Sequence, residues 1–123
     1  MSEQTEKASA AVLVVDDELN VRTLADVVLT LSGYAVRTAG TPSEALDILA
    51  GQPDIKVVLA DIVLPEMTGY DFVDRAQRIA PGARIVLMSG HASDYVRRGG
   101  DHRFLPKPFS VSSLRNVIAD AAA

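Results

Sequence analysis

The stretch from Val57 to Gly69 constrains the fold of this chain more than any other part of the sequence. Four consecutive apolar residues, 57–60, are followed by Asp61 and then by a turn that contains Pro65. A short apolar run favours a strand buried on both faces, as in a parallel sheet covered by helices. Asp61 would then stand at the carboxyl end of the strand, the edge at which open α/β sheets bind ligands.

The rest of the chain alternates strand-like and helix-like segments. Strands are predicted at residues 11–15, 34–38, 56–60, 84–88 and 103–105. Apolar residues recur at helical spacing between them, as with Leu24, Val27, Val28 and Leu31 before Gly33. Further helices are predicted to begin at Thr41, near Thr68 and at Ser110, with a short one over 91–98. This alternation predicts a flavodoxin-like, doubly wound α/β fold with a five-stranded parallel sheet in the order 2-1-3-4-5.

The composition excludes several classes of protein. A hydrophobic share of 48% argues against disorder, and no apolar run approaches a membrane span. The absence of cysteine excludes disulfides and cysteine-held metals, and a net charge of -4 argues against a nucleic-acid surface. We expect a flexible tail over residues 1–9 and one domain over residues 10–123. No secretory signal is visible, so we also expect a cytoplasmic location.

Groups with chemical potential follow four of the predicted strands. They are Asp16 and Asp17 after the first strand, Asp61 after the third, Ser89 after the fourth and Lys107 after the fifth. Clustered carboxylates repel one another, so they must bind a proton or a cation, and oxygen ligands favour Mg²⁺. Mg²⁺ and Lys107 could neutralise an incoming phosphoryl group, to which the Ser89 hydroxyl could donate. Asp61 is then a candidate nucleophile that would form an aspartyl phosphate.

Each of these residues also has a simpler interpretation. Asp17 and Glu18 could simply place negative charge at a helix N-terminus, and Asp61 could simply cap a turn. Ser89 could belong to an ordinary turn and Lys107 could be a solvated lysine. The agreement of four separate strand ends favours a site over these alternatives.

Four motifs together resemble one known family. They are Val-Val-Asp-Asp-Glu at 14–18, Leu-Ala-Asp-Ile-Val-Leu-Pro-Glu-Met-Thr-Gly at 59–69, Leu-Met-Ser-Gly at 87–90 and Phe-Leu-Pro-Lys-Pro-Phe at 104–109. With them the chain resembles the response-regulator receiver domains of two-component signalling, of the stand-alone or hybrid-kinase type. The resemblance covers the chain from about Ala11 to its end.

The resemblance implies a phosphoacceptor signalling domain. Asp61 would take a phosphoryl group from a histidine kinase or a histidine phosphotransfer domain. Such a domain catalyses only its own phosphorylation and dephosphorylation, and it neither binds nucleic acid directly nor inserts into a membrane. The implied Mg²⁺ ligands are Asp17, Asp61 and the backbone carbonyl of Val63, with Asp16 acting through metal-bound water.

The resemblance also implies a switch. Lys107 would pair with the phosphoryl group, and Ser89 and Phe104 would fill the hydroxyl and aromatic switch positions. The bond between Lys107 and Pro108 would be a cis peptide. The changed surface would comprise the fourth helix, the fifth strand and the last helix, where an unknown downstream protein would bind.

The chain departs from the family pattern between Ser89 and Lys107. This span is short and contains Arg-Arg-Gly-Gly-Asp-His at 97–102, so we expect a shortened fourth helix. No effector module is visible after the last helix, which fits either a stand-alone protein or a receiver cut from a larger chain.

Three alternative functions compete with the phosphoacceptor. A degenerate receiver would bind partners without phosphorylation, but no acidic residue or lysine of the pattern is missing here. An aspartyl phosphatase would commonly need a second aspartate where this chain has Val63. A flavin-binding protein would need phosphate donors where Asp16, Asp17 and Glu18 would repel the ligand.

Overall fold

The computed structural model describes residues 10–90 and 102–123, and the structural statements below concern these residues. Strands and helices alternate along the described chain. They are β1 (Ala11–Val15), α2 (Leu19–Leu31), β2 (Ala35–Ala39), α3 (Pro42–Gly51), β3 (Val57–Asp61), α4 (Gly69–Ile79), β4 (Arg84–Ser89), β5 (Arg103–Pro106) and α6 (Val111–Ala122). The predicted short fourth helix over 91–98 and the predicted tail over 1–9 lie outside the described residues.

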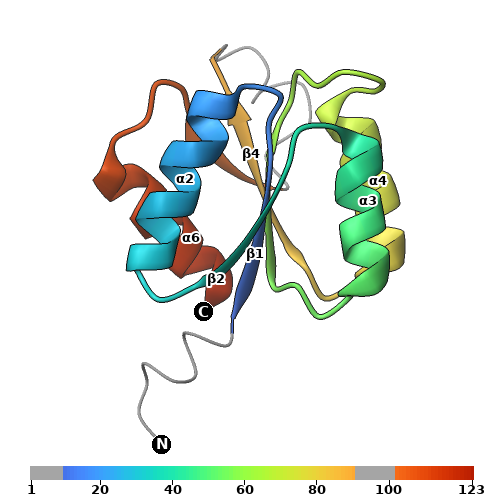
Figure 1. The fold of residues 1–123 in the computed structure, drawn as a ribbon, viewed down its shortest axis with the longest axis horizontal. Coiled ribbons are helices and arrows are strands. Elements are labelled where there is room, and N and C mark those ends of the chain that lie inside the picture. Colours follow the sequence, from blue (N-terminus) through green and yellow to red (C-terminus); the bar gives the residue numbers. More distant parts are fainter. Residues whose placement is uncertain (1–9, 91–101) are drawn as a thin grey trace, which may run out of the picture.

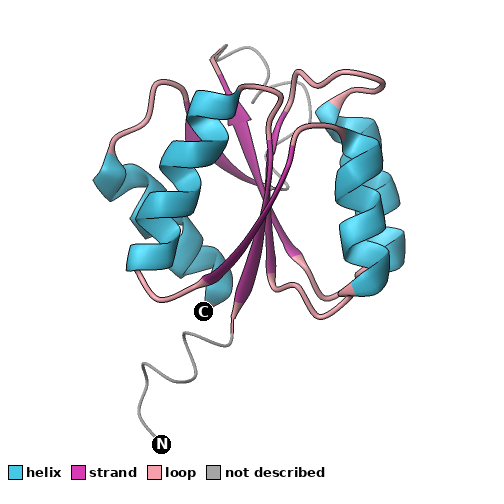
Figure 2. Ribbon diagram, viewed as in Figure 1, coloured by secondary structure: helices cyan, strands magenta, loops and turns pink. Residues whose placement is uncertain are grey.

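The strands form one parallel sheet in the order β2-β1-β3-β4-β5, as predicted. Helices α2 and α6 cover one face of the sheet, and α3 and α4 cover the other (Figures 1 and 2). The chain leaves β1 in one direction along the sheet and returns to its other side at β3, so the order reverses between these two strands. Ligand sites of open α/β sheets lie at this point.

The central strands are buried on both faces. In β1 and β3 every residue is buried, and successive side chains enter opposite core clusters. One cluster contains Leu13, Val58 and Phe72, on the side of α3 and α4. The other contains Val14, Leu59 and Leu114, on the side of α2 and α6. This explains why the third strand reads as an unbroken apolar run.

The helix ends form where the sequence predicts them. The hydroxyls of Thr41, Thr68 and Ser110 each accept a hydrogen bond from the backbone N–H three residues further on. Gly33, with a φ of 101°, follows the end of α2 in a left-handed conformation that glycine adopts without strain.

The buried face of α2 differs from the one suggested by the apolar spacing. Of the four residues identified there, only Val28 is buried, whereas Leu24, Val27 and Leu31 are 44%, 52% and 83% exposed. The helix instead buries Ala25, Val28 and Leu29. These three residues form the i, i+3, i+4 stripe that faces the sheet, and Leu24, Val27 and Leu31 lie off this stripe and face solvent.

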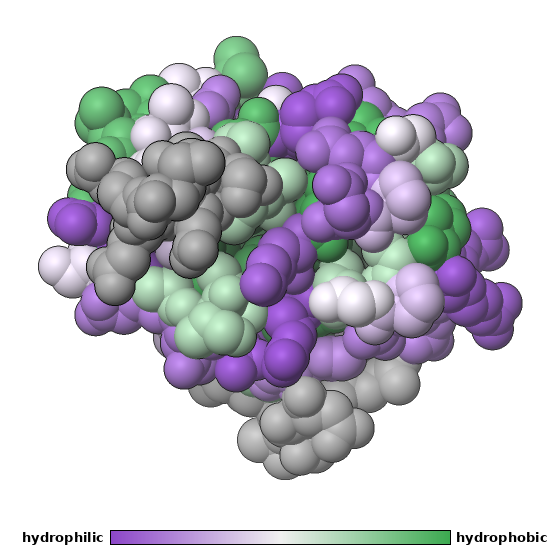
Figure 3. Space-filling model, turned by 90° about the horizontal axis from the view of Figure 1, so that it is seen from below, coloured by the Kyte–Doolittle hydropathy of each residue, from purple (hydrophilic) through white to green (hydrophobic). Residues whose placement is uncertain are grey.

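The amino ends of the strands face away from the candidate site edge. Figure 3 views this end of the molecule, where hydrophilic and hydrophobic residues are interspersed over the described surface. Among the described helices, none combines the length and the apolarity that crossing a bilayer requires.

The turn after β3 depends on Gly69, the first residue of α4. A Cβ atom at this position would lie 2.6 Å from the carbonyl oxygen of Asp61 and 2.6 Å from Cα of Ile62. The backbone N–H of Gly69 also donates to the carbonyl of Ile62 at 2.7 Å. Only glycine permits this close approach of the helix to the end of β3.

Replacing Gly69 by alanine should therefore destabilise the protein. We expect Gly69→Ala to lower the free energy of unfolding by about 1–3 kcal/mol, because backbone atoms must move to admit the methyl group. Urea denaturation measures this difference. Gly82→Ala is the matched control, since a Cβ there meets nothing within 4 Å. Equal stability of the two variants would contradict the close-approach argument.

Candidate functional site

The carboxyl edge of the sheet gathers the side chains that the sequence singled out. Asp16 follows β1, Asp61 ends β3, Ser89 ends β4 and Lys107 follows β5. Because β1, β3, β4 and β5 are consecutive in the sheet, these four residues stand along one edge. Asp16, Asp61 and Ser89 are all buried.

The ammonium group of Lys107 bridges the two buried carboxylates. Its Nζ donates to Oδ2 of Asp16 at 2.7 Å and to Oδ2 of Asp61 at 2.6 Å, and it lies 3.6 Å from Oε1 of Glu18. Burial alone would lower the pKa of Lys107, but its hydrogen bonds to Asp16 and Asp61 and their negative charges outweigh it, and the pKa is raised. Lys107 therefore stays charged and offsets the repulsion between the carboxylates.

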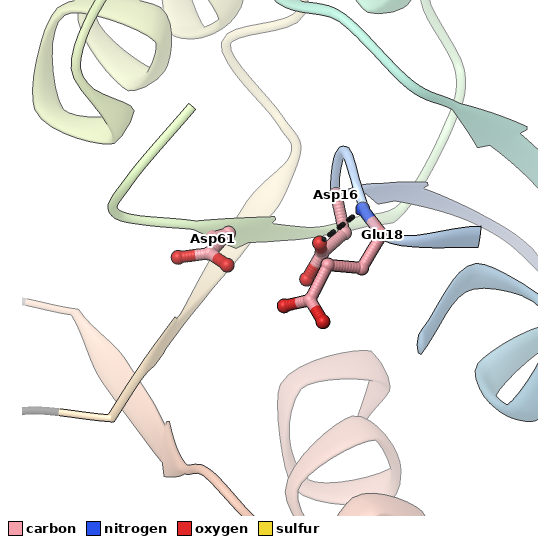
Figure 4. A group of neighbouring side chains, drawn as sticks. All are labelled: Asp16, Glu18 and Asp61. Carbon is pink, nitrogen blue, oxygen red and sulfur yellow. Dashed lines mark hydrogen bonds between the residues drawn. The ribbon is translucent and has the colours of Figure 1, made fainter. Parts of the chain in front are cut away.

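Three carboxylates lie close enough together to share a cation. One oxygen from each of Asp16, Glu18 and Asp61 falls within 4.8 Å of the others. Figure 4 shows Asp16 and Glu18 rising from one loop and Asp61 from β3 beside them, with the backbone N–H of Glu18 donating to Oδ1 of Asp16 at 2.9 Å. An all-oxygen set of negative donors suits a hard divalent ion such as Mg²⁺.

Asp17 lies outside this group in the structure. It is exposed, whereas Asp16 is fully buried. The family resemblance implies a direct metal contact for Asp17, and the sequence predicts for Glu18 only a charge at a helix N-terminus. The run Asp-Asp-Glu was the available signal for Glu18, but sequence alone does not say which of three successive carboxylates point into the site.

The loop after Asp61 holds the orientation of its carboxylate. The backbone N–H of Val63 donates to Oδ1 of Asp61 at 2.9 Å, while Lys107 contacts Oδ2. The Val63 side chain points outward and is 67% exposed. Both oxygens of Asp61 are thus bound, and the carboxylate has a defined direction.

Arg22 is a second residue of the site that no sequence motif indicates. Its Nη1 donates to the carbonyl oxygen of Asp16 at 2.8 Å. The same atom would lie 3.1 Å from a Cβ at Gly40, so the guanidinium packs under the loop after β2. Arg22 therefore links the β1–α2 loop, which carries Asp16 and Glu18, to the neighbouring loop.

The remaining predicted residues belong to β4, β5 and the turn that follows β5. The backbone N–H of Lys107 donates to the carbonyl of Ser89 at 2.8 Å, and the bond between Lys107 and Pro108 is cis. Phe104 on β5 is half-buried and packs against the core on the side of α3 and α4.

The fold and the edge cluster define a flavodoxin-like α/β protein with an acidic, lysine-bridged site at the point where the strand order reverses. The chain belongs to the response regulator receiver domain family, whose family model matches residues 12–119. The sequence-based resemblance is thereby confirmed, and the protein is a receiver domain of two-component systems.

Relatives of known name support this membership. The chain is 34% identical over 120 residues to the DNA-binding transcriptional regulator NtrC of Azospirillum brasilense, covering 93% of this chain and 24% of NtrC. It is 36% identical over 119 residues to the sensor kinase CckA of Brucella abortus, covering 91% of this chain and 12% of CckA. The chain thus spans a quarter or less of the length of these relatives.

A solved structure of similar size shows the same fold. The chemotaxis response regulator CheY4 of Vibrio cholerae superposes with a TM-score of 0.80 at 28% sequence identity, covering 91% of this chain and 98% of that one.

Removing the ammonium group should destabilise the fold over a wide pH range. Lys107→Met leaves Asp16 and Asp61 facing each other, and we expect a loss of about 1–3 kcal/mol, below the ~3–5 kcal/mol of a fully buried pair because Lys107 is partly exposed. The pKa of Lys107 is raised on folding, so its contribution is fully present below the unfolded pKa of about 10.5. It disappears only as the pH rises through the folded pKa.

Chemical denaturation of wild type and Lys107→Met at several pH values measures this contribution. The stability difference should stay constant from neutral pH to about pH 9 and shrink at more alkaline pH. Lys56→Met, at an exposed position just before β3, is the control and should show no such difference. A difference that disappears below pH 9 would contradict the assignment of the charge to Lys107.

Proposed function

We propose that this receiver domain accepts a phosphoryl group on Asp61 and thereby switches a protein-binding surface. The observation that carries the proposal is the position of Lys107 Nζ, within 2.6 Å of Asp61 Oδ2 and 2.7 Å of Asp16 Oδ2. A phosphoryl group on Asp61 would meet an ammonium group that is already in place. This follows the general rule that preorganised charge stabilises phosphoryl transfer.

The phosphoryl donor is a phosphohistidine on a histidine kinase or on a histidine phosphotransfer domain. An oxygen of the Asp61 carboxylate forms the new P–O bond while the P–N bond of the phosphohistidine breaks, and the imidazole leaves with a proton from water. The relation to CckA, a sensor kinase by name, supports this class of partner. The protein turns over no other substrate.

Mg²⁺ is the proposed cofactor, and it would neutralise charge on the phosphoryl oxygens. Asp16, Glu18 and Asp61 supply the clustered carboxylates. Asp17 and the backbone carbonyl of Val63, the ligands implied by the family resemblance, remain predicted members of the set. Lys107 contacts Oδ2 of both Asp16 and Asp61, so Mg²⁺ would compete with its ammonium group for these oxygens.

Ser89 and Phe104 are the proposed switch residues. Ser89 is buried next to the site and Phe104 is half-buried on the neighbouring edge strand β5. A phosphoryl group on Asp61 favours the conformer in which the Ser89 hydroxyl moves toward it, which leaves space for Phe104 to turn inward. The phosphoryl group shifts this equilibrium by its differential affinity for the two conformers.

The changed surface lies on the β5 side of the sheet and presents the signal to a downstream protein. Of this surface the structure describes β5 and α6, whereas the predicted fourth helix lies outside the described residues. The proposed output is therefore a change of binding partner rather than a product.

Phosphorylation with a small-molecule donor tests the proposal directly. Incubation with acetyl phosphate and Mg²⁺ should add the mass of one phosphoryl group to the wild-type chain, as measured by intact mass spectrometry. Asp61→Asn should remain unmodified, since an amide cannot form the acyl phosphate. Removal of Mg²⁺ by a chelator should slow the wild-type reaction at least tenfold, because a metal ion contributes several kcal/mol of charge stabilisation and about 1.4 kcal/mol already corresponds to tenfold in rate.

Three results would contradict the proposal in different ways. An adduct that persists in Asp61→Asn would place the acceptor elsewhere. An adduct that forms equally fast in the presence of chelator would contradict the proposed role of Mg²⁺. No adduct on the wild-type chain, with none mimicked by beryllofluoride, would favour the alternative of a receiver that binds partners without phosphorylation.

A further inference from the structure

A second polar link ties the loop after Asp61 to the start of helix α3. Oε1 of Glu66 accepts hydrogen bonds from both the backbone N–H and the hydroxyl of Ser43, at 3.0 Å and 2.8 Å. Ser43 is the second residue of α3, which begins at Pro42. The two residues are 23 positions apart in sequence, so this link fixes the loop to a different element of the fold.

The backbone at Glu66 adopts an uncommon conformation next to this link. Glu66 has a φ of 70°, in the left-handed region that residues other than glycine rarely adopt. Such a conformation persists only where the surroundings hold it. Here the carboxylate is held at the N-terminus of α3, where unpaired N–H groups and the helix dipole favour a negative charge.

The same loop sets the direction of the Asp61 carboxylate. Val63 N–H contacts Oδ1 of Asp61, and the N–H of Gly69 contacts the carbonyl of Ile62 at the other end of the loop. Between these two points, Leu64 and Met67 pack against the core, and Glu66 adds the polar link to α3. With Glu66 released, the segment that carries Val63 would keep its apolar contacts but lose the hydrogen bonds to Ser43.

We propose that Ser43 and Glu66 are positioning residues for phosphorylation of Asp61, acting through Val63. This inference rests on the proposed function and extends it to two residues that do not touch the reacting atoms. Both side chains are exposed, so their hydrogen bonds contribute little to global stability. Their effect falls on the geometry of the acceptor, where a displacement of about 1 Å can cost ~100-fold in rate.

The test measures phosphorylation rates with acetyl phosphate and Mg²⁺ over a range of donor concentrations. Ser43→Ala should lower the maximal rate constant roughly three- to tenfold, a fraction of the ~100-fold cost of a 1 Å displacement. The half-saturating donor concentration should not change. Ser43→Thr keeps the hydroxyl and should restore the rate. Glu66→Gly accepts the positive φ without strain and removes both hydrogen bonds, so it should lose at least as much as Ser43→Ala, which keeps the backbone N–H donor.

Two further measurements separate positioning from a structural effect. Hydrogen exchange of the Val63 amide should accelerate in Ser43→Ala and Glu66→Gly, while the urea midpoint of both variants stays close to that of wild type. Ser112→Ala is the matched control, because Ser112 is an exposed serine at the same second position of α6. It should leave both the rate and the exchange unchanged.

The outcomes distinguish the two proposals. A wild-type chain that acquires no phosphoryl group on Asp61 overturns the proposed function and this inference with it. If Asp61 is phosphorylated in wild type, and Ser43→Ala and Glu66→Gly show the same maximal rate as wild type, only the positioning role is overturned. Loss of rate in Ser43→Thr equal to that in Ser43→Ala also overturns it, because the hydroxyl would not matter.

Discussion

The ammonium group of Lys107, held between the carboxylates of Asp16 and Asp61, is the interaction on which the site depends. Two carboxylates at the ends of adjacent strands repel each other, and burial makes that repulsion larger. Lys107 follows β5, the last strand of the sheet, and its ammonium group contacts an oxygen of each carboxylate. The ammonium group offsets the repulsion between the two carboxylates. It also places a positive charge where a phosphoryl group on Asp61 would need one.

The sheet makes this geometry possible. Residues 16, 61 and 107 are up to 91 positions apart, and the parallel sheet brings the carboxyl ends of their strands to one edge, with β1 and β3 adjacent. The buried central strands and the close approach of Gly69 fix the backbone at Asp61, while the Val63 amide and Lys107 fix its side chain. Core packing on both faces therefore determines the chemistry at the edge, although no core residue takes part in it.

Much of this arrangement could be predicted from the sequence because it follows from short-range patterns. The apolar run before Asp61 predicts a strand covered by helices on both faces, and Thr41, Thr68 and Ser110 predict helix starts.

The sequence predicts less where several similar residues compete for one position in the fold. Nothing in the run Asp-Asp-Glu indicates that Glu18 joins the cluster while Asp17 lies exposed. The exposed leucines of α2 likewise obey helical spacing, yet the sheet selects the face that carries the small Ala25. Contacts such as Arg22 with Asp16 and Ser43 with Glu66 depend on the packing of loops, which no local pattern encodes.

The central claim is that Lys107 acts as the built-in cation of the acidic cluster. Calorimetric titration of Mg²⁺ into wild type and Lys107→Met measures this directly, with Lys56→Met as the control for loss of a remote lysine. Because the ammonium group competes for the oxygens of Asp16 and Asp61, the account predicts roughly tenfold tighter Mg²⁺ binding in Lys107→Met, about 1.4 kcal/mol. Unchanged or weaker binding in Lys107→Met would contradict it.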